Sequence, residues 1–358
     1  MPFKWENRFT TSLSIDRLFY KKEANKQMRE EAPTIQIKES CHHFHATFVF
    51  HMALHRTILL ASALAAVSLQ FLIAAALREE VPWDKEVNAF YVAVGAASPP
   101  DNNTCFERAF GPLPSDGVRT YQTRCDNIGN FCIVKLGRSS ENQTIFVSFR
   151  GSFFGQTFVE VFEADKRVPL GSSSQNATVS TYFLTAFEKL WIQTSFKDDF
   201  TEMALIHPTD TILISGHSLG AALGAVMTAK IAEWTRFTNP IDLYQYGSPR
   251  VGDKGFTKIV ASRARVLFQA IHFLDCVPAF PVPEKGFSRM NGVKLYLSAN
   301  MTSDAPSAWC ENGEEKNCVT CNGAPFLDFC YKCALHNTYY ELDDVASFGE
   351  TGCPHEIL

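Results

Sequence analysis

The sequence has no excess of basic residues, and this absence excludes one class of partner. Lys and Arg together number 33 against 38 Asp and Glu in 358 residues, so the formal net charge is -5 and the isoelectric point is about 6.1. A protein that grips the phosphate backbone of a nucleic acid presents a basic surface, so we expect no nucleic-acid partner. The sequence also lacks an internal repeat, and its length suits one large domain or two at most.

Long apolar runs are scarce as well, and one stands out at residues 57–77, TILLASALAAVSLQFLIAAAL. Arg56 precedes the run, an alanine triplet ends it, and Met52 lies just upstream. A basic start, an apolar middle and a small-residue exit are typical of a secretory signal peptide. We therefore favour translation from Met52 and cleavage near Ala76, which makes residues 52–77 a signal peptide. The alternative is a type II signal anchor, with the preceding residues held in the cytosol.

Both interpretations place the rest of the chain in the exoplasmic space, and two further features agree with that. Four Asn-x-Ser/Thr sequons are candidate glycosylation sites, which matter only in the secretory route: Asn102, Asn142, Asn176 and Asn300. Ten of the eleven cysteines follow the apolar run. An oxidising compartment would convert most of them to disulfides. We expect a secreted glycoprotein, or one anchored with this part outside.

Residues 1–51 are polar, mixed in charge and without a usable period. We expect this segment to be disordered or absent from the mature protein. Its CHHFH stretch, Cys41 to His45, resembles a metal-binding tract, but no second ligand cluster accompanies it. We expect no metal there.

From residue 84 to 358 the pattern is that of a single α/β domain. FCIVKLG and QTIFVSFRG are β-rich runs separated by a turn, which predicts a hairpin. Aromatic residues at helical spacing predict a helix over 182–200. The short strand DTILISG, the small-residue helix LGAALGAVMTAKIAEW and the strands IDLYQYG and RVLFQAIHFL follow. Alternating strands and helices indicate a mostly parallel central sheet flanked by helices.

The strand and helix at residues 211–230 enclose a Gly-x-Ser-x-Gly motif with Ser218 at its centre. A strand, a sharp turn and a helix are the setting of a nucleophile elbow, in which glycines permit a strained serine and close strand–helix packing. The helix start would also place the Leu219 N–H beside a developing oxyanion. The motif alone is weak, because a glycine-rich turn can contain an incidental serine.

A nucleophilic serine needs a base, and the base needs an orienting acid, in the chain order Ser, acid, His. His336 and His355 are the downstream histidines outside a strand pattern, and His336 is preferred because His355 is close to the C-terminus. We interpret His217, beside the serine, as a packing residue. Asp275 ends a strand pattern before Pro278 and is the preferred acid. The alternatives lie in polar loops: Asp253, Asp304, Asp328, Asp343 and Asp344.

Five motifs occur in the order VSFRGS, ISGHSLGAAL, YGSPRVGDKGF, IHFLDCVP and HNTYY. Over about residues 85–350 the chain resembles the class 3 lipases, the family that contains the fungal triacylglycerol lipases. The resemblance implies an α/β-hydrolase fold and a catalytic triad of Ser218, Asp275 and His336. It also implies that Ser152 supplies an oxyanion N–H and hydroxyl, with the Leu219 N–H as second donor. The elbow continues Gly-Ala-Ala where the family more often has Gly-Gly-Ala.

After Ser152 the segment FFGQTFVEVFEAD occupies the place of a lid in these lipases. An apolar helical stripe runs along it, at Phe154, Phe158, Val161 and Phe162. The stripe suits a mobile cover or a core-facing helix. The segment lacks the Asn-Trp lid pattern of the fungal enzymes, so interfacial activation is left open.

Residues 310–333 hold CVTC and CYKC eight residues apart, a spacing that suits a four-thiolate zinc site. In a secreted chain disulfides are favoured, and they would staple the long loop between Asp275 and His336. Cys276, next to Asp275, is the candidate free thiol.

Together these features predict a secreted serine hydrolase of carboxylic esters of lipids, with triacylglycerol as the favoured substrate and no cofactor or metal. A phospholipase or a non-lipid carboxylesterase is the close alternative. From other classes, a non-catalytic hydrolase-fold binding protein and a Cys-rich interaction or zinc module are the rivals.

Overall fold

The computed structural model describes residues 80–114, 117–126, 129–152, 164–171, 176–231, 237–273, 275–310, 313–314 and 333–357. Within Glu80–Leu358, which form one unit, an eight-stranded sheet has the order β1-β2-β3-β6-β7-β8-β9-β10. Its strands are β1 (Val118–Arg124), β2 (Phe131–Ser139), β3 (Thr144–Phe149), β6 (Thr211–His217), β7 (Ile241–Tyr246), β8 (Ala264–Ile271), β9 (Val293–Tyr296) and β10 (Ser307–Cys310).

The centre of this sheet is parallel, as the alternating pattern predicts. Neighbouring strands are parallel from β3 through β6, β7 and β8 to β9. At the edges, β1, β2 and β3 form an antiparallel meander and β10 pairs antiparallel with β9. The predicted hairpin is the β2–β3 pair. A small separate sheet joins β4 (Arg167–Pro169) to β5 (Thr178–Ser180). The parallel centre explains why its strands are apolar almost throughout, since helices cover both faces.

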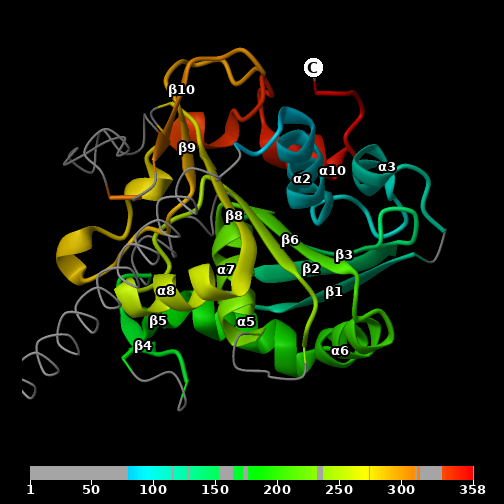
Figure 1. Cartoon of the computed structure of the whole chain (residues 1–358), viewed down its shortest axis with the longest axis horizontal. Helices are drawn as coiled ribbons and strands as arrows, with labels where there is room; N and C mark the ends of the chain where they lie inside the picture. The colour runs from blue at the N-terminus through cyan, green and yellow to red at the C-terminus, as the bar shows by residue number, and fades with distance from the viewer. Residues whose placement is uncertain are drawn as a thin grey trace, which may run out of the picture. The chain divides into compact units, whose positions relative to one another are not determined.

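One layer of helices packs on each face (Figure 1). On one side lie α5 (Thr181–Gln193), α6 (Phe196–Ile206), α7 (Leu219–Ile231) and α8 (Lys254–Arg263). The other side carries α2 (Trp83–Gly95), α3 (Thr104–Phe110) and α10 (Val345–Glu350). The sequence predicts one helix over 182–200, but the chain breaks it at Thr194 and Ser195, where the Thr194 hydroxyl accepts from the Phe196 N–H. Among the residues described, no helix combines the length and apolar character needed to cross a membrane.

Short 3-10 turns lie between β8 and β9 and after β10. They are η1 (Val277–Ala279), η2 (Pro283–Lys285) and η4 (Cys333–Asn337). Strand β8 ends at Ile271, so Asp275 lies four residues beyond the strand and just before η1, rather than at the strand end as predicted. His336 lies inside η4, not in an open loop. Both residues are therefore held by turns at the carboxyl edge of the sheet.

Disulfides support this unit. Cys105 in α3 is bonded to Cys353 near the C-terminus, across 248 residues, and Cys125 is bonded to Cys132 between β1 and β2. Cys276 and Cys310 are also disulfide-bonded. The prediction of a free thiol at Cys276 is therefore wrong. A thiol next to a buried aspartate has no special need to stay reduced when another cysteine lies within bonding distance.

Candidate active site

The predicted elbow is present between β6 and α7. Ser218 follows the last residue of β6 and precedes the first residue of α7, and its φ is +57°, in the left-handed region that non-glycine residues rarely adopt. Its side chain is buried, and its backbone N–H donates to the Tyr246 carbonyl at the end of β7 at 2.9 Å. A strained serine held in this way is typical of a nucleophile.

The two glycines of the motif are required by close packing. A Cβ at Gly216 would lie 2.3 Å from the backbone of Gly220, and a Cβ at Gly220 would lie 2.1 Å from the Phe149 carbonyl oxygen. Because these neighbours are backbone atoms, neither position has room for a side chain. The glycines thus allow α7 to start directly against β6 and the end of β3, which fixes Ser218 at the sheet edge.

Asp275 and His336, 61 residues apart, meet in the interior. The His336 Nδ1 lies 2.9 and 3.0 Å from the two carboxylate oxygens of Asp275. Burial would raise the pKa of the Asp275 carboxyl, but His336, the Tyr339 hydroxyl and the Val277 N–H together hold it below its ordinary value. Asp275 is therefore a carboxylate, and it requires the ring proton of His336 to reside on Nδ1.

The other ring nitrogen of His336 is left available. Its Nε2 is buried and makes no hydrogen bond to any residue in the described ranges. With the proton on Nδ1, this Nε2 carries a lone pair and can accept a proton. An unpaired buried nitrogen is uncommon and costly, so it indicates a place for a reacting group.

Strand β7 connects this pair to the elbow. Tyr246 accepts from the Ser218 N–H, and the next residue, Gly247, has φ +59°. A Cβ at Gly247 would lie 2.9 Å from an Asp275 carboxylate oxygen and 2.9 Å from His336 Cε1. The last residue of β7 and the glycine after it therefore contact the serine backbone on one side and the Asp–His pair on the other.

Tyr339 is a site residue that the sequence did not single out for a role. Its hydroxyl donates to Asp275 Oδ2 at 2.7 Å and accepts from the His272 N–H at 3.2 Å. The Val277 N–H donates to the other oxygen, Oδ1, at 2.9 Å. The only sequence signal was the pair of tyrosines in HNTYY, whose contact with Asp275 depends on a fold that brings distant segments together.

His217 has the packing role that the sequence suggests. Its ring lies 4.5 Å from the His336 ring, centroid to centroid, and its Nε2 lies 2.8 Å from the His336 carbonyl oxygen. Burial, together with the charge of His336, lowers the pKa of His217 to about 3. The residue is therefore neutral at neutral pH and donates to His336 rather than competing with it as a base.

The pKa of His217 predicts acid sensitivity of the fold. Between about pH 6.5 and 3 the unfolded chain binds a proton at this residue and the folded chain does not, so the free energy of unfolding decreases as pH falls. From pH 6.5 to 4 the loss is about 3 kcal/mol. His217→Gln keeps a donor and removes the titration, so urea unfolding at several pH values should show a shallower pH dependence for the variant. Equal slopes for the two proteins would refute this origin.

The two proposed oxyanion donors come from the elbow itself and from the end of β3. Leu219 is buried and opens α7, so no carbonyl in its own helix accepts its N–H. Ser152 is half-buried and follows Gly151, whose added Cβ would lie 3.1 Å from the His217 carbonyl oxygen. The exit of β3 thus runs against the elbow, and it brings Ser152 to the same edge of the sheet.

The alternative acids and base serve other purposes. Asp253 caps α8 by accepting from the Phe256 N–H, and Asp344 caps α10 by accepting from the Ala346 N–H. Asp304 accepts from the neighbouring Thr302 hydroxyl. His355 is exposed and packs edge-on against Phe348. Of the candidates in the described ranges, Asp275 and His336 are the pair that meets.

Several predicted features lie outside the described residues. They are the apolar run 57–77, residues 1–51 with CHHFH, the lid candidates Phe154, Phe158, Val161 and Phe162, Asp328, and most of the Cys-rich stretch 310–333. These remain expectations from the sequence.

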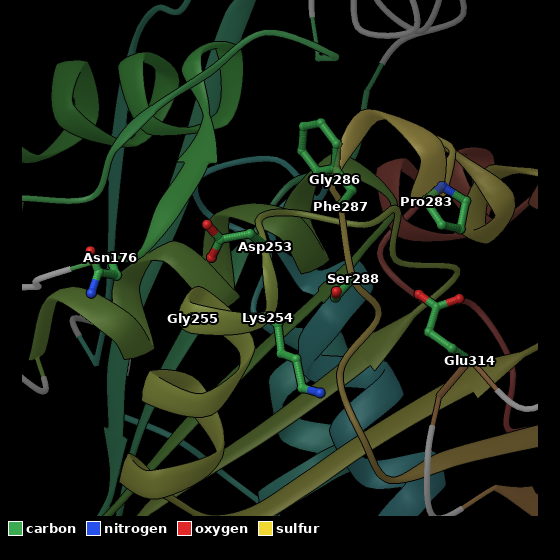
Figure 2. A pocket seen from close by; sticks show the side chains of 9 residues that line it. All are labelled: Asn176, Asp253, Lys254, Gly255, Pro283, Gly286, Phe287, Ser288 and Glu314. Atoms are coloured by element: carbon green, nitrogen blue, oxygen red, sulfur yellow. The ribbon is translucent and has the colours of Figure 1, made fainter.

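A hollow of about 640 Å³ lies between α8, η2 and the loop after it (Figure 2). Asp253, Lys254, Phe287 and Glu314 are among the residues that line it, and its lining includes none of Ser218, Asp275 and His336. Asp253 is occupied in capping α8, and Glu314 forms a bidentate pair with Arg250. This hollow is therefore separate from the Asp–His pair and is not assigned to the substrate.

Comparison with known proteins agrees with this geometry. The family model for lipase (class 3) matches residues 146–285. A lipase of Caenorhabditis elegans is 26% identical over 71% of this chain and 77% of its own length. A secreted mono- and diacylglycerol lipase of Fusarium solani is 32% identical over 41% of this chain and 42% of its length. The chain thus spans less than half of that fungal relative in sequence.

Solved structures extend the match over the fold. Lipase II from Rhizopus niveus superposes with a TM-score of 0.58 over 74% of this chain and 96% of its own, at 20% identity, which shows a shared α/β-hydrolase fold. The resemblance inferred from the five motifs is confirmed by the lipase (class 3) model over residues 146–285 and by these lipase relatives, and the chain is a carboxylic ester hydrolase of the α/β-hydrolase fold.

Proposed function

We propose that the protein hydrolyses acylglycerols, with triacylglycerol as a substrate, through an acyl-enzyme formed on Ser218. The observation that carries the proposal is a buried His336 whose Nδ1 is bonded to the Asp275 carboxylate and whose Nε2 is left without a partner in the described part. A base prepared in this way beside a strained serine suits nucleophilic catalysis.

In the proposed reaction the Ser218 Oγ attacks the acyl carbonyl carbon while His336 Nε2 takes its proton. The carbonyl π electrons move to oxygen, and the Leu219 N–H with the Ser152 N–H and hydroxyl stabilise the resulting oxyanion. His336 then gives the proton to the departing glyceride oxygen, which leaves an ester on Ser218. A water molecule, deprotonated by His336, attacks this ester; the acyl C–O bond breaks, His336 returns the proton to Ser218 Oγ, and the fatty acid is released. Asp275 stays ionised and stabilises the imidazolium in both halves.

Assays with esters of graded acyl length, each dissolved and emulsified, test the substrate class. Mono-, di- and triacylglycerols, a phospholipid and short p-nitrophenyl esters form the panel. We expect fatty acid release from the emulsified acylglycerols, at a higher kcat/KM than for the phospholipid. Preference for the phospholipid would establish a phospholipase instead, and activity on dissolved short esters alone would establish a carboxylesterase. Lack of any cleavage would favour the binding-protein alternative.

We also propose that the protein is secreted. Disulfides such as Cys105–Cys353 are characteristic of oxidising compartments, and the Fusarium relative is named as secreted. The four sequons provide a test of secretion, because the surroundings of their asparagine side chains differ in whether a glycan can be attached. Asn142, Asn176 and Asn300 are exposed. The Asn102 side chain packs on Gly352, where an added Cβ would lie 2.1 Å from its Nδ2. The Asn142 Nδ2 donates to the Phe110 carbonyl and the Ser139 hydroxyl.

We expect glycans on Asn176 and Asn300, and none on Asn102 and Asn142. A glycan on Nδ2 would displace Asn102 from its packing or remove one of the two hydrogen bonds of the exposed Asn142, whereas Asn176 and Asn300 lose neither kind of contact. Peptide mapping by mass spectrometry, before and after glycosidase treatment of protein secreted by eukaryotic cells, reads the occupancy. A glycosylated Asn102 or a bare Asn300 would contradict the prediction, and protein retained entirely in the cytosol would contradict secretion.

A further inference from the structure

A buried polar cluster includes Tyr340, from the turn that follows η4 and His336. Glu86, in α2, is fully buried, and its Oε1 accepts hydrogen bonds from the hydroxyls of Tyr296 at 2.6 Å and Tyr340 at 2.7 Å. Its Oε2 accepts from Lys294 Nζ at 2.8 Å, and its backbone carbonyl accepts from the Tyr246 hydroxyl. The carboxylate is thus fully engaged, by groups from the sheet and from one loop.

Of these partners, Tyr340 is the one that leads to the candidate active site. It follows Tyr339, whose hydroxyl is bonded to Asp275, and it lies four residues after His336. Tyr340 and Glu341 have φ values of +54° and +61°, so two consecutive non-glycine residues are held in the left-handed region. Such a backbone is strained and persists only where neighbouring contacts impose it.

The Tyr340 hydroxyl keeps its proton and so remains a hydrogen-bond donor to Glu86. Burial, with the charge of Glu86 next to it, raises the pKa of Tyr340 well above its ordinary value. The Lys294 ammonium balances the charge of Glu86 within the same cluster. The ring of Tyr340 packs edge-on against Phe90 at 4.6 Å and Trp83 at 5.6 Å, so removal of the hydroxyl alone leaves the apolar packing in place.

We propose that Glu86 is a positioning residue for catalysis: by anchoring the Tyr340 hydroxyl, it holds the strained turn that places Tyr339 on Asp275 and keeps His336 in register with Ser218. The inference rests on the proposed roles of Asp275 and His336. It assigns to α2, more than 180 residues before the elements it controls, a function in the reaction as well as in the fold.

Two tyrosines on one carboxylate oxygen supply a matched pair of variants. Tyr340→Phe and Tyr296→Phe each delete one hydroxyl bonded to Glu86 Oε1, but Tyr296 lies on β9, outside the His336 turn. Its ring meets that of Tyr340 edge-on at 6.4 Å, a contact that removal of the hydroxyl leaves in place. We expect Tyr340→Phe to lower kcat on a soluble ester about tenfold, with little change in KM, and to shift the acid limb of the kcat–pH profile. Tyr296→Phe should keep kcat within about twofold of wild type, although both lose a similar hydrogen bond.

If the cluster only stabilised the fold, the two variants would behave alike. Equal kcat values and equal pH profiles for the two variants, alongside equal losses of thermal stability, would overturn the inference. A Ser218→Ala protein that kept its activity would instead refute the proposed function. If Ser218→Ala is inactive and Tyr340→Phe matches Tyr296→Phe, the inference alone fails.

A second pair covers the case in which Tyr340→Phe does not fold. Glu86→Gln with Lys294→Met removes both charges and keeps an acceptor for Tyr340, whereas Glu86→Met with Lys294→Met removes that acceptor. We expect kcat to be about tenfold lower in the Met pair than in the Gln pair. Equal kcat in the two double variants would contradict the positioning role.

Discussion

Replacement of Ser218 by alanine is expected to reduce ester hydrolysis by about 10⁴-fold or more. The variant removes the atom that forms the acyl-enzyme, and the oxyanion donors and Asp275–His336 pair can then assist only a weak direct attack by water. Alanine at φ +57° is no more strained than serine, so the elbow should retain its shape. Fatty acid release from a triacylglycerol emulsion and from a short soluble ester measures the effect.

Ser262→Ala is the matched control for that variant. Ser262 is exposed on α8, and its hydroxyl donates to the Ile259 carbonyl one turn earlier. Both variants should unfold within a few degrees of wild type, and Ser262→Ala should keep full activity. If Ser218→Ala retained more than about a hundredth of the wild-type rate, the covalent mechanism would be wrong.

Substitution of Asp275 by asparagine is expected to lower kcat/KM by about 10³- to 10⁴-fold. His336 Nδ1 is nearly equidistant from the two carboxylate oxygens, and each oxygen also accepts from a second donor, the Val277 N–H or the Tyr339 hydroxyl. In asparagine, one of the two oxygens is replaced by an NH₂ group, which cannot accept from the donors at that position. If this NH₂ donates to His336 Nδ1, the ring proton moves to Nε2, and His336 can no longer act as the base.

Asp253→Asn is the control for the charge change, because Asp253 caps α8 and has no contact with His336 among the described residues. It should reduce thermal stability slightly and leave kcat/KM unchanged.

The depressed pKa of Asp275 adds a further expectation: this carboxylate stabilises the fold above its ordinary pKa, and that contribution is lost as pH falls through the lower folded value. The loss should be absent from Asp275→Asn. Activity of Asp275→Asn within tenfold of wild type would mean that another acid orients the base.

Local chemistry made the elbow predictable. The apolar residues before Ser218 form a buried strand, and the small residues after it form a helix. The glycines on either side allow the strand and the helix to pack backbone against backbone. The parallel sheet was predictable for a similar reason, because buried strands and their covering helices leave periodic apolar patterns.

Relations between distant residues were not predictable in the same way. Nothing around Asp275 in the sequence reveals that its carboxylate accepts from Tyr339, since the contact depends on how η4 docks against η1. Glu86 reads as one acidic residue in an amphipathic helix, and only the fold buries it beneath Tyr340. The disulfide at Cys276 was missed because its pairing is a matter of three-dimensional distance.

Covalent labelling with an organophosphonate ester tests the central claim most directly. Such a probe reacts with a serine only when a neighbouring base activates it, and it leaves a stable phosphonyl ester on the oxygen. We predict one label per chain, located on Ser218 by peptide mass spectrometry, with loss of hydrolysis in proportion to labelling and almost no reaction in His336→Ala. A label on another serine, or full hydrolytic activity in protein whose Ser218 is fully labelled, would contradict the account.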